Sequence, residues 1–329
     1  MKQQPLLPAM PRRGLLRMAA FGAAGWLGLG GPALQQSAAQ VPTPDPPAKA
    51  NPTVFQIACC TSAYSEFPLA RALHGVSSAG FKFVSWGTTH REEDGQRHPY
   101  LPIDASLEQA KTLAQRCRDL GLEPVAMYGM VPLEQPDAIS QLTQRIKQAG
   151  AAGVHQLLVA AQTASGNRPL WVERLKQLGP VAKDHHVAIV LKQTLGESGS
   201  GKACAEIASE VNHPYVKVNY DAGAVRDALN IDPIPDFQMC HEMVRSICAN
   251  DHRHVPKKQT CAPGLGEIDH YRLLSLVAHT GRKMPVCCEN VFAPLLPKPV
   301  KAEEIDDLAG RARKFLEIVT TGLQTDYTA

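Results

Sequence analysis

The sequence predicts an α/β protein built as a single (β/α)8 barrel, and two observations lead to that fold class. Short runs rich in β-branched residues alternate with amphipathic helical patterns, and this alternation occurs eight times. Alternating strands and helices form parallel sheets with crossover helices, and eight such units close into a barrel. The chain has 329 residues, which is enough for one barrel of roughly 250 residues and an extension.

The eight strands of the barrel are expected in the chain order that follows. They are Val54–Cys60, Phe81–Trp86, Leu122–Tyr128, Val154–Ala160, Val187–Lys192, Val216–Asp221, Ile247–Asp251 and Met284–Glu289. The catalytic groups of such a barrel lie where its strands end and the following loops begin. We therefore look for functional residues at the C-terminal ends of these eight runs.

Residues 1–39 predict a twin-arginine signal peptide. Arg12 and Arg13 stand before an apolar pair and a third arginine, a Gly/Ala/Leu-rich stretch runs from Met18 to Leu34, and small residues at 37–39 offer a cleavage site. The prediction implies export to the periplasm by the twin-arginine machinery. The alternative is an N-terminal membrane anchor, although an apolar stretch of about 17 residues is at the short limit of a membrane span.

Residues 40–53 are predicted to form a Pro-rich linker, and residues 54–329 are predicted to form the barrel. The formal charge of +3 arises in the first 39 residues, which carry four basic residues and no acidic one. The remaining chain is nearly neutral and only 5% of all residues are aromatic, so it lacks the charge pattern of a nucleic-acid-binding protein. The sequence leaves a homo-oligomer open.

Four of the nine cysteines are expected to be small core residues, and a structural zinc site is not expected. Two adjacent pairs, Cys59-Cys60 and Cys287-Cys288, lie inside expected strands, where neighbouring side chains face opposite sides. No Cys-x-x-Cys pair is present in the sequence, and such pairs are typical of structural zinc sites.

A Gly-rich stretch at residues 196–203 differs from a nucleotide-binding P-loop at one position. Ala203 stands where a Ser or Thr hydroxyl would bind magnesium, which disfavours an NTPase. The turn leads into a helix, so backbone N–H groups at Gly199 and Gly201 can bind an anionic or polar group of a substrate. A mobile surface loop is the alternative.

Polar residues end several of the expected strands. Asp221 ends the sixth strand and Glu289 ends the eighth, and two such carboxylates can share a divalent cation or divide the work of acid and base. The alternative is that each caps a helix or forms a salt bridge. After the seventh strand, Asn250 is a candidate for substrate binding and His252 for proton transfer near neutral pH. His90, after the second strand, is a further substrate-binding candidate.

These features together resemble the sugar phosphate isomerase/epimerase superfamily of xylose isomerase-like barrels, and most closely its exported branch with twin-arginine signals. The similarity covers roughly residues 54–320, and the matching stretches are residues 80–84, 196–203, 213–223, 251–253, 264–269 and Glu289. The resemblance implies a small carbohydrate as the substrate. It also adds Gly264 and Gly266 as substrate-binding candidates.

The metal site that the resemblance implies is altered in this sequence. Family members usually take a Glu from the fifth strand, an Asp from the sixth, a His from the seventh and a Glu from the eighth. Asp221 and Glu289 match two of these positions, so a divalent ion (Mn, Mg or Zn) is expected on them. Lys192 falls at the fifth-strand position, and Cys248 falls near the seventh-strand position. These two departures speak against the standard metal site and against a proton shuttle between paired glutamates.

The function predicted from the resemblance is that of a carbohydrate isomerase or epimerase. Glu289 would move a proton on the carbon next to a carbonyl, and either a metal ion or Lys192 would hold the resulting enediolate oxygen. One alternative is a lyase that acts on an oxidised sugar or glycoside by the same proton abstraction. A second is a sugar-binding barrel without catalysis that has lost its metal. Lys192 discriminates between these, because a catalytic site must use it.

Overall fold

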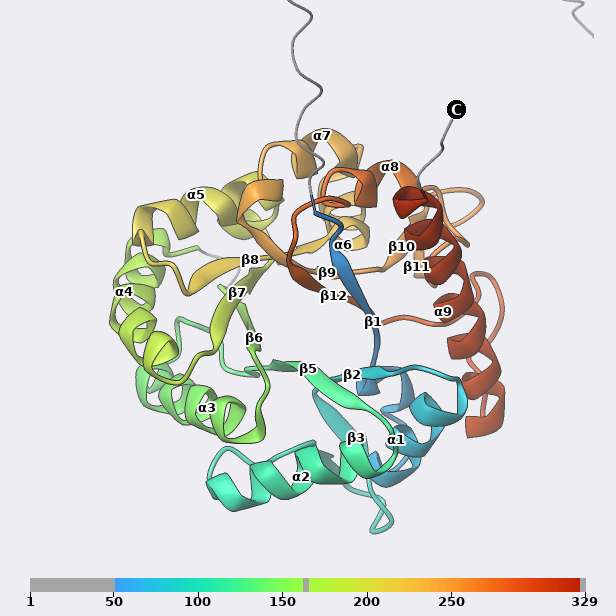
Figure 1. Cartoon of the computed structure of the whole chain (residues 1–329), viewed down its shortest axis with the longest axis horizontal. Helices are drawn as coiled ribbons and strands as arrows, with labels where there is room; N and C mark the ends of the chain where they lie inside the picture. The colour runs from blue at the N-terminus through green and yellow to red at the C-terminus, as the bar shows by residue number, and fades with distance from the viewer. Residues whose placement is uncertain (1–50, 162–165, 326–329) are drawn as a thin grey trace, which may run out of the picture. The chain divides into compact units, whose positions relative to one another are not determined.

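Eight parallel strands close into a barrel in the computed structural model, which describes residues 51–161 and 166–325 (Figure 1). The predicted signal peptide and almost all of the predicted linker lie outside these residues. Around the barrel the strands follow the order β1-β12-β9-β8-β7-β6-β5-β2. Their bounds are Val54–Cys60 (β1), Phe83–Trp86 (β2), Glu123–Tyr128 (β5), Gln156–Ala160 (β6), Ala188–Lys192 (β7), Val216–Asp221 (β8), Val244–Cys248 (β9) and Lys283–Cys288 (β12). The predicted fold class is confirmed.

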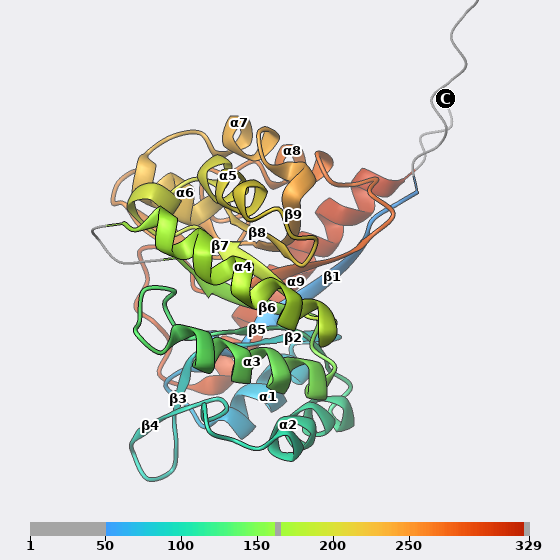
Figure 2. The ribbon, with the colours of Figure 1, turned by 90° about the vertical axis from the view of Figure 1, so that its left-hand side faces the viewer.

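Helices surround the barrel and cover the outer face of the strands (Figures 1 and 2). The described helices are Leu69–Ser78 (α1), Leu107–Asp119 (α2), Ala138–Ala152 (α3), Arg168–Asp184 (α4), Gly201–Val211 (α5), Ala222–Leu229 (α6), Pro233–Gln238 (α7), His270–Ser275 (α8) and Ala302–Gln324 (α9). Alanine and branched aliphatic residues of their inner faces form one large buried core with the outward side chains of the strands. Within the described ranges, no helix is both long and apolar enough to cross a membrane.

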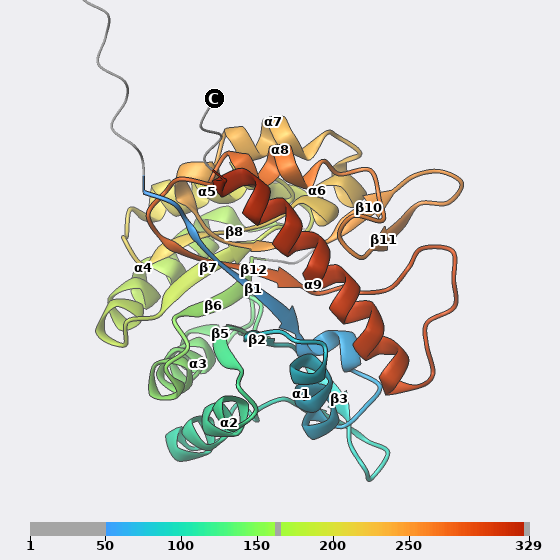
Figure 3. The ribbon, with the colours of Figure 1, turned by 45° about the vertical axis from the view of Figure 1, so that its right-hand side comes forward.

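Two short antiparallel hairpins lie outside the barrel. The first pairs β3 (Thr89–Arg91) with β4 (Arg97–Pro99), and the second pairs β10 (Asp251–Arg253) with β11 (Gln259–Cys261). Figure 2 shows the first hairpin projecting beyond the end of the barrel, and Figure 3 shows the second beside α6 and α9. Both follow barrel strands, so they belong to the loop side where a barrel carries its chemistry.

The seventh strand was predicted wrongly. The structure places it at Val244–Cys248, whereas the sequence indicated Ile247–Asp251. Polar Arg245 and Ser246 interrupt the apolar run, which hid the true start of the strand. Asp251 instead begins the β10–β11 hairpin, because its carboxylate accepts N–H groups from a following loop. The other seven predictions agree with the structure to within two residues at each end.

Side-chain caps fix the helices that follow the functional strands. The Ser200 hydroxyl accepts the N–H of Ala203 at the start of α5, and the Asp221 carboxylate accepts the N–H of Ala224 at the start of α6. Such caps satisfy backbone donors that a helix leaves open at its first turn. Asp221 therefore serves as the helix cap that the sequence suggested as an alternative, while its second oxygen accepts hydrogen bonds from Lys192 and Asn250.

The last helix, α9, closes the ring against α1 and α8 (Figure 3). An ion pair joins the first and the last helix of the barrel, because Arg71 on α1 lies 2.7 Å from Asp306 on α9. All nine cysteines are buried and free, and the burial of Cys59-Cys60 and Cys287-Cys288 confirms the prediction that these two pairs are core residues.

Candidate functional site

Four neighbouring strands each end with a polar side chain that points to one place in the barrel mouth. Lys192 ends β7, Asp221 ends β8, Cys248 ends β9, and Glu289 directly follows β12. These strands are consecutive in the barrel. Because parallel strands end at the same rim, the fold gathers side chains that are up to 97 residues apart in the sequence.

Lys192 lies between the two carboxylates. Its Nζ is 2.6 Å from Asp221 Oδ2, and it is 3.0 Å and 2.9 Å from the two oxygens of Glu289. The Lys192 side chain is 16% exposed, Glu289 is 15% exposed and Asp221 is 2% exposed. The ammonium group is thus a largely desolvated cation with two acidic partners.

Asn250 and Cys248 complete the contacts of the two carboxylates. Asn250 Nδ2 donates to Asp221 Oδ2 and to Glu289 Oε2, both at 3.0 Å. Cys248 Sγ lies 2.8 Å from Glu289 Oε1 and 3.1 Å from Asn219 Oδ1. The site is therefore a connected network in which each charged group has fixed partners.

The electrostatics of the network favour proton exchange at Glu289. Burial raises the pKa of the Glu289 carboxyl to about 8, while N–H donors from Lys192 and Asn250 support its ionised form. Burial is the largest single influence on the pKa of Lys192 and lowers it, but Asp221 and Cys248 together outweigh burial through their charges and hydrogen bonds and raise this pKa. Lys192 thus remains a cation, and the protonation of Glu289 changes near neutral pH.

Asp221, Cys248 and Glu289 form a group that could hold a metal ion. One ligand atom of each lies within 4.8 Å of the others, and carboxylate with thiolate is a donor set that zinc accepts. However, Lys192 Nζ lies within hydrogen-bonding distance of both carboxylates in the same place. A divalent ion there would face the ammonium charge, so the residues present do not fit a metal while Lys192 keeps this position.

The structure does not bring His252 to this network. Its side chain is fully buried, its Nε2 lies 3.7 Å from Asp227 Oδ1 on α6, and its ring packs at 4.9 Å against the ring of His254. Burial lowers the pKa of His252. The β10–β11 hairpin turns the side chain toward α6, so His252 makes no hydrogen bond with Lys192, Asp221 or Glu289.

His90 is also buried, and both of its ring nitrogens have partners inside the protein. They lie 3.1 Å from the Phe67 carbonyl oxygen and 3.1 Å from Thr61 Oγ1. Burial lowers the pKa of His90. The residue ties the β3–β4 hairpin to the loop after β1, and its part in substrate binding stays a prediction.

The four candidate glycines donate their backbone N–H groups to other parts of the protein. Gly201 donates to Asp236 on α7 at 2.8 Å, and Gly199 donates to the Gly196 carbonyl oxygen at 3.0 Å. Gly264 and Gly266 both donate to Asp251 at 3.0 Å. Two internal carboxylates thus occupy the turns where the sequence suggested a ligand, so these glycines stay predictions as substrate contacts.

A cavity of about 220 Å³ opens beside Lys192. Of its lining residues only Lys192 was a candidate from the sequence, and Tyr128 ends a strand that was predicted correctly. The other lining residues come from the ends of β5 and β6 and the loop after β5, and are Met130, Val131, Pro132, Leu158 and Ala160. The cavity contacts the charged network, so it is the candidate substrate site.

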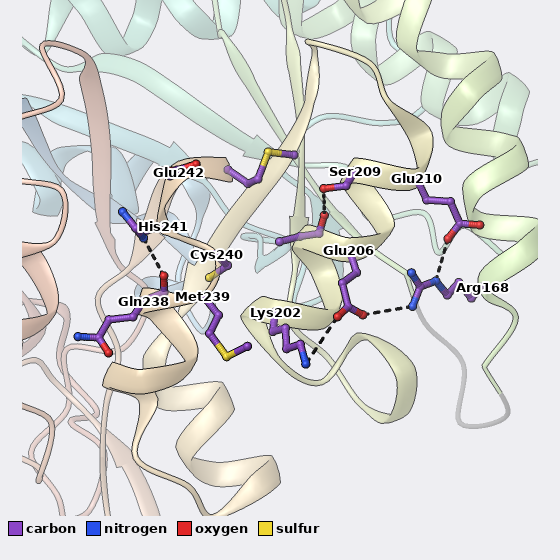
Figure 4. A pocket seen from close by; sticks show the side chains of 12 residues that line it. Arg168, Lys202, Glu206, Ser209, Glu210, Gln238, Met239, Cys240, His241 and Glu242 are labelled. Carbon is purple, nitrogen blue, oxygen red and sulfur yellow. Dashed lines mark hydrogen bonds and ion pairs between the residues drawn. The ribbon is translucent and has the colours of Figure 1, made fainter.

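A larger cavity, of about 660 Å³, lies elsewhere (Figure 4). It is an open groove between α4, α5 and the segment that joins α7 to β9. Its charged side chains pair with one another, as Arg168 does with Glu206 and Glu210. None of the network residues lines it, so its size does not make it the catalytic site.

Comparisons with known proteins support the fold. The family described as "Xylose isomerase-like TIM barrel" matches residues 73–317, and no curated protein matches the chain. Among solved structures, a xylose isomerase-like TIM barrel/4-hydroxyphenylpyruvate dioxygenase fusion protein is 18% identical with a TM-score of 0.62. The match covers 84% of this chain but only 46% of that protein.

Two single-barrel structures are similar over their whole length. The IOLI protein, described with a binding zinc atom, is 17% identical with a TM-score of 0.63, and the match covers 82% of this chain and 100% of that one. D-allulose 3-epimerase from Methylomonas sp. is 16% identical with a TM-score of 0.58, covering 82% and 99%. At these identities the similarity establishes the fold alone.

Proposed function

Because this chain belongs to the xylose isomerase-like TIM barrel family, we propose that it is a sugar isomerase or epimerase in which Lys192 takes the place of the family's usual metal. The observation that carries the proposal is the position of Lys192 Nζ, 2.6 Å from Asp221 and 2.9 Å from Glu289. A cation at this point supplies what an enediolate requires, which is a fixed positive charge in a desolvated site.

In the proposed reaction Glu289 is the base. Its carboxylate takes the proton from the carbon next to the substrate carbonyl, the C–H electrons form a carbon–carbon double bond, and the carbonyl oxygen becomes an oxyanion. Lys192 donates an N–H group to that oxygen, while Asp221 holds the ammonium in place. The hydroxyl proton on the carbon that lost its proton passes to this oxyanion, and Glu289 returns the abstracted proton to the former carbonyl carbon, so that the carbonyl group moves to the adjacent carbon without loss of atoms.

One base on one face is sufficient for the exchange between an aldose and a ketose. Epimerisation at a single carbon requires a second proton donor on the opposite face. Among the described residues of the network, Glu289 alone has a pKa raised to the neutral range. Isomerisation is therefore the member of this reaction class that the site supports best.

A lyase is the second candidate, and the cavity beside Lys192 favours it. Abstraction of a proton next to a keto group also begins the elimination of a glycosidic substituent. The apolar lining of the cavity would suit such a leaving group. The two reactions share the first step and differ in whether a substituent is released.

The test is exchange of the substrate proton with deuterated water, followed by NMR on a panel of aldoses and ketoses with and without a chelator. We expect exchange that withstands chelation and that is lost in Glu289→Gln. Exchange that stops with chelator and returns with added zinc would contradict the role of Lys192. Sugars that bind without exchange would support a non-catalytic sugar-binding barrel.

A further inference from the structure

We infer that the substrate is an uncharged sugar derivative with an apolar substituent, and that this substituent packs against Met130 in the cavity beside Lys192. The inference rests on the proposed function for the reacting part of the substrate. It adds the chemical class of the rest of the molecule, which the reaction alone does not define.

The lining of the cavity is the first observation. Six of its residues are Tyr128, Met130, Val131, Pro132, Leu158 and Ala160, and Lys192 is the one charged side chain among the described residues that line it. A free sugar presents hydroxyl groups on nearly all sides, and those that face the apolar side chains would lose water without gaining a protein partner, since only Tyr128 and Lys192 carry polar side-chain groups in this lining. An apolar group loses nothing in such a place, so the lining favours an aryl or alkyl substituent.

The size of the cavity fits one ring. It measures about 220 Å³, and a cavity of about 150 Å³ lined by apolar side chains holds benzene. A phenyl group therefore fits beside Lys192, with room for the bond to a sugar. A second sugar ring would bring several unpaired hydroxyl groups to the same walls.

The charge of the network is the second observation. Lys192 already has two acidic partners, Asp221 and Glu289, so the site has no surplus positive charge. A phosphate or carboxylate on the substrate would add a third negative group within reach of one ammonium. Uncharged derivatives are therefore preferred over sugar phosphates and sugar acids.

The backbone at Met130 is the third observation. Met130 has φ +59°, a left-handed conformation that side chains disfavour and glycine adopts freely. It is 37% exposed and lines the cavity. Backbone strain of this kind is typical of functional sites. A methionine held there presents a flexible apolar side chain to the cavity, which indicates a contact with a ligand.

Leu295 provides a matched control. Among the residues that the structure describes, it is the other apolar residue with left-handed backbone, at φ +65°, and it is 50% exposed in the loop before α9. It does not line the cavity. Leu295→Gly therefore relieves the same backbone strain without a change in the cavity wall.

The experiment compares phenyl and methyl glycosides of D-glucose and D-galactose, in both anomers, with glucose 6-phosphate as the charged probe. Binding to the full chain is measured by calorimetry for the wild type, Met130→Gly, Met130→Ala and Leu295→Gly. We expect phenyl glycosides to bind at least ~10-fold more tightly than methyl glycosides, since even one methylene in an apolar pocket changes discrimination by ~10-fold or more. Glucose 6-phosphate should bind most weakly.

The variants separate the effect of the Met130 side chain on ligand binding from the effect of its backbone strain on stability. Both Met130 variants should bring the phenyl-to-methyl ratio close to one, chiefly by weakening the binding of phenyl glycosides. Met130→Gly and Leu295→Gly should keep or raise the melting temperature, and Leu295→Gly should keep the wild-type ratio. A ratio near one in the wild type, no binding of phenyl glycosides at millimolar concentration, or tighter binding of the phosphate would overturn the inference.

Failure of the inference and failure of the proposed function give different results. A phenyl-to-methyl ratio near one together with intact proton exchange would contradict the apolar substituent and still support the proposed isomerase. A high ratio that depends on Met130, together with no proton exchange on the panel of aldoses and ketoses, supports the substituent site and contradicts the proposed reaction; the glycosides have no free carbonyl and serve only as binding probes.

Discussion

Lys192 Nζ and Glu289 Oε2 are 2.9 Å apart, at the ends of two strands that are not neighbours in the barrel. Asp221 lies on the strand between β7 and β9 and contacts the same ammonium at 2.6 Å. This arrangement puts an internal cation where family members usually bind a metal. It also ties the charge of the site to the protonation of a single residue, Glu289.

Lys192→Met should destabilise the fold. Removing one partner of a buried ion pair leaves an uncompensated charge and typically costs about 3 kcal/mol. The loss should be largest above the pKa of Glu289, which is about 8, and smaller well below it, where a proton neutralises that carboxyl. Chemical denaturation at both pH values measures it. Lys202→Met is the control, because its ion pair with Glu206 is exposed and spans 3.8 Å; an equal loss in both variants would contradict the role of burial.

Glu289→Gln should abolish most proton exchange and keep the fold. The amide retains the shape and hydrogen-bonding reach of the side chain but cannot accept the substrate proton, and loss of a general base typically lowers the rate ~10²–10⁴-fold. Deuterium exchange and thermal melting are measured on the same samples. Glu242→Gln, at an exposed position, is the control. Unchanged exchange in a folded Glu289→Gln protein would remove this residue from the mechanism.

The pH dependence of the wild type should follow Glu289 in two ways. The folded pKa of about 8 lies above the value of about 4.3 for an unfolded glutamate. Between these values the folded chain holds a proton that the unfolded chain has released. The stabilisation is therefore complete below about pH 4.3 and is lost as the pH rises through about 8. Activity should instead increase over the same rise, since the base must be ionised.

Glu289→Gln tests this assignment, because it should flatten the dependence of stability on pH across that window. The expected slope in the wild type is at most about 1.4 kcal/mol per pH unit from one group. Denaturation midpoints of both proteins across the pH range provide the comparison. Parallel curves would assign the pH dependence to other residues.

Asp236→Ala should destabilise the Gly-rich turn before α5. The Asp236 carboxylate accepts N–H groups from Gly201 at 2.8 Å and from Lys202 at 3.1 Å. Hydrogen bonds to a charged group contribute about 1.5–3 kcal/mol, so a loss of about 2 kcal/mol is expected. Asp236→Asn keeps one acceptor oxygen and should lose less. Equal stability of all three proteins in urea would mean that this carboxylate does not support the turn.

Export is a separate prediction, because residues 1–39 lie outside the described part of the chain. If Arg12 and Arg13 form a twin-arginine signal, replacing both with lysine should leave an unprocessed protein in the cytoplasm. Fractionation followed by immunoblotting measures this. Normal processing of the variant would indicate an ordinary secretory route or a membrane anchor.

The sequence was sufficient to predict the fold and the positions of single residues at strand ends, but it did not predict which residues contact one another. Period-two apolar runs locate strands, and strand ends place Lys192, Asp221 and Glu289 at one rim. The ion pair between Lys192 and Asp221 depends on the closure of the barrel. A local sequence pattern does not predict that closure. The seventh strand was displaced for a local reason, since Arg245 and Ser246 interrupt its apolar character.

The Gly-rich turns show the same limit. The sequence marked their backbone N–H groups as donors for a ligand, but in the structure the N–H groups of Gly201, Gly264 and Gly266 donate to carboxylates of distant residues. Asp236 lies on α7, 35 residues after Gly201, and Asp251 precedes Gly264 across a hairpin. A turn whose N–H groups bind an anionic ligand and a turn whose N–H groups bind a carboxylate of the same protein can have the same local sequence.

The metal content of the protein purified without chelators tests the central claim most directly. If Lys192 takes the place of the metal, the wild type should contain far less than one zinc, manganese or magnesium ion per chain by elemental analysis. Lys192→Glu, which restores a third carboxylate, should gain zinc under the same conditions. One tightly bound ion per wild-type chain, lost in Asp221→Asn, would contradict the account.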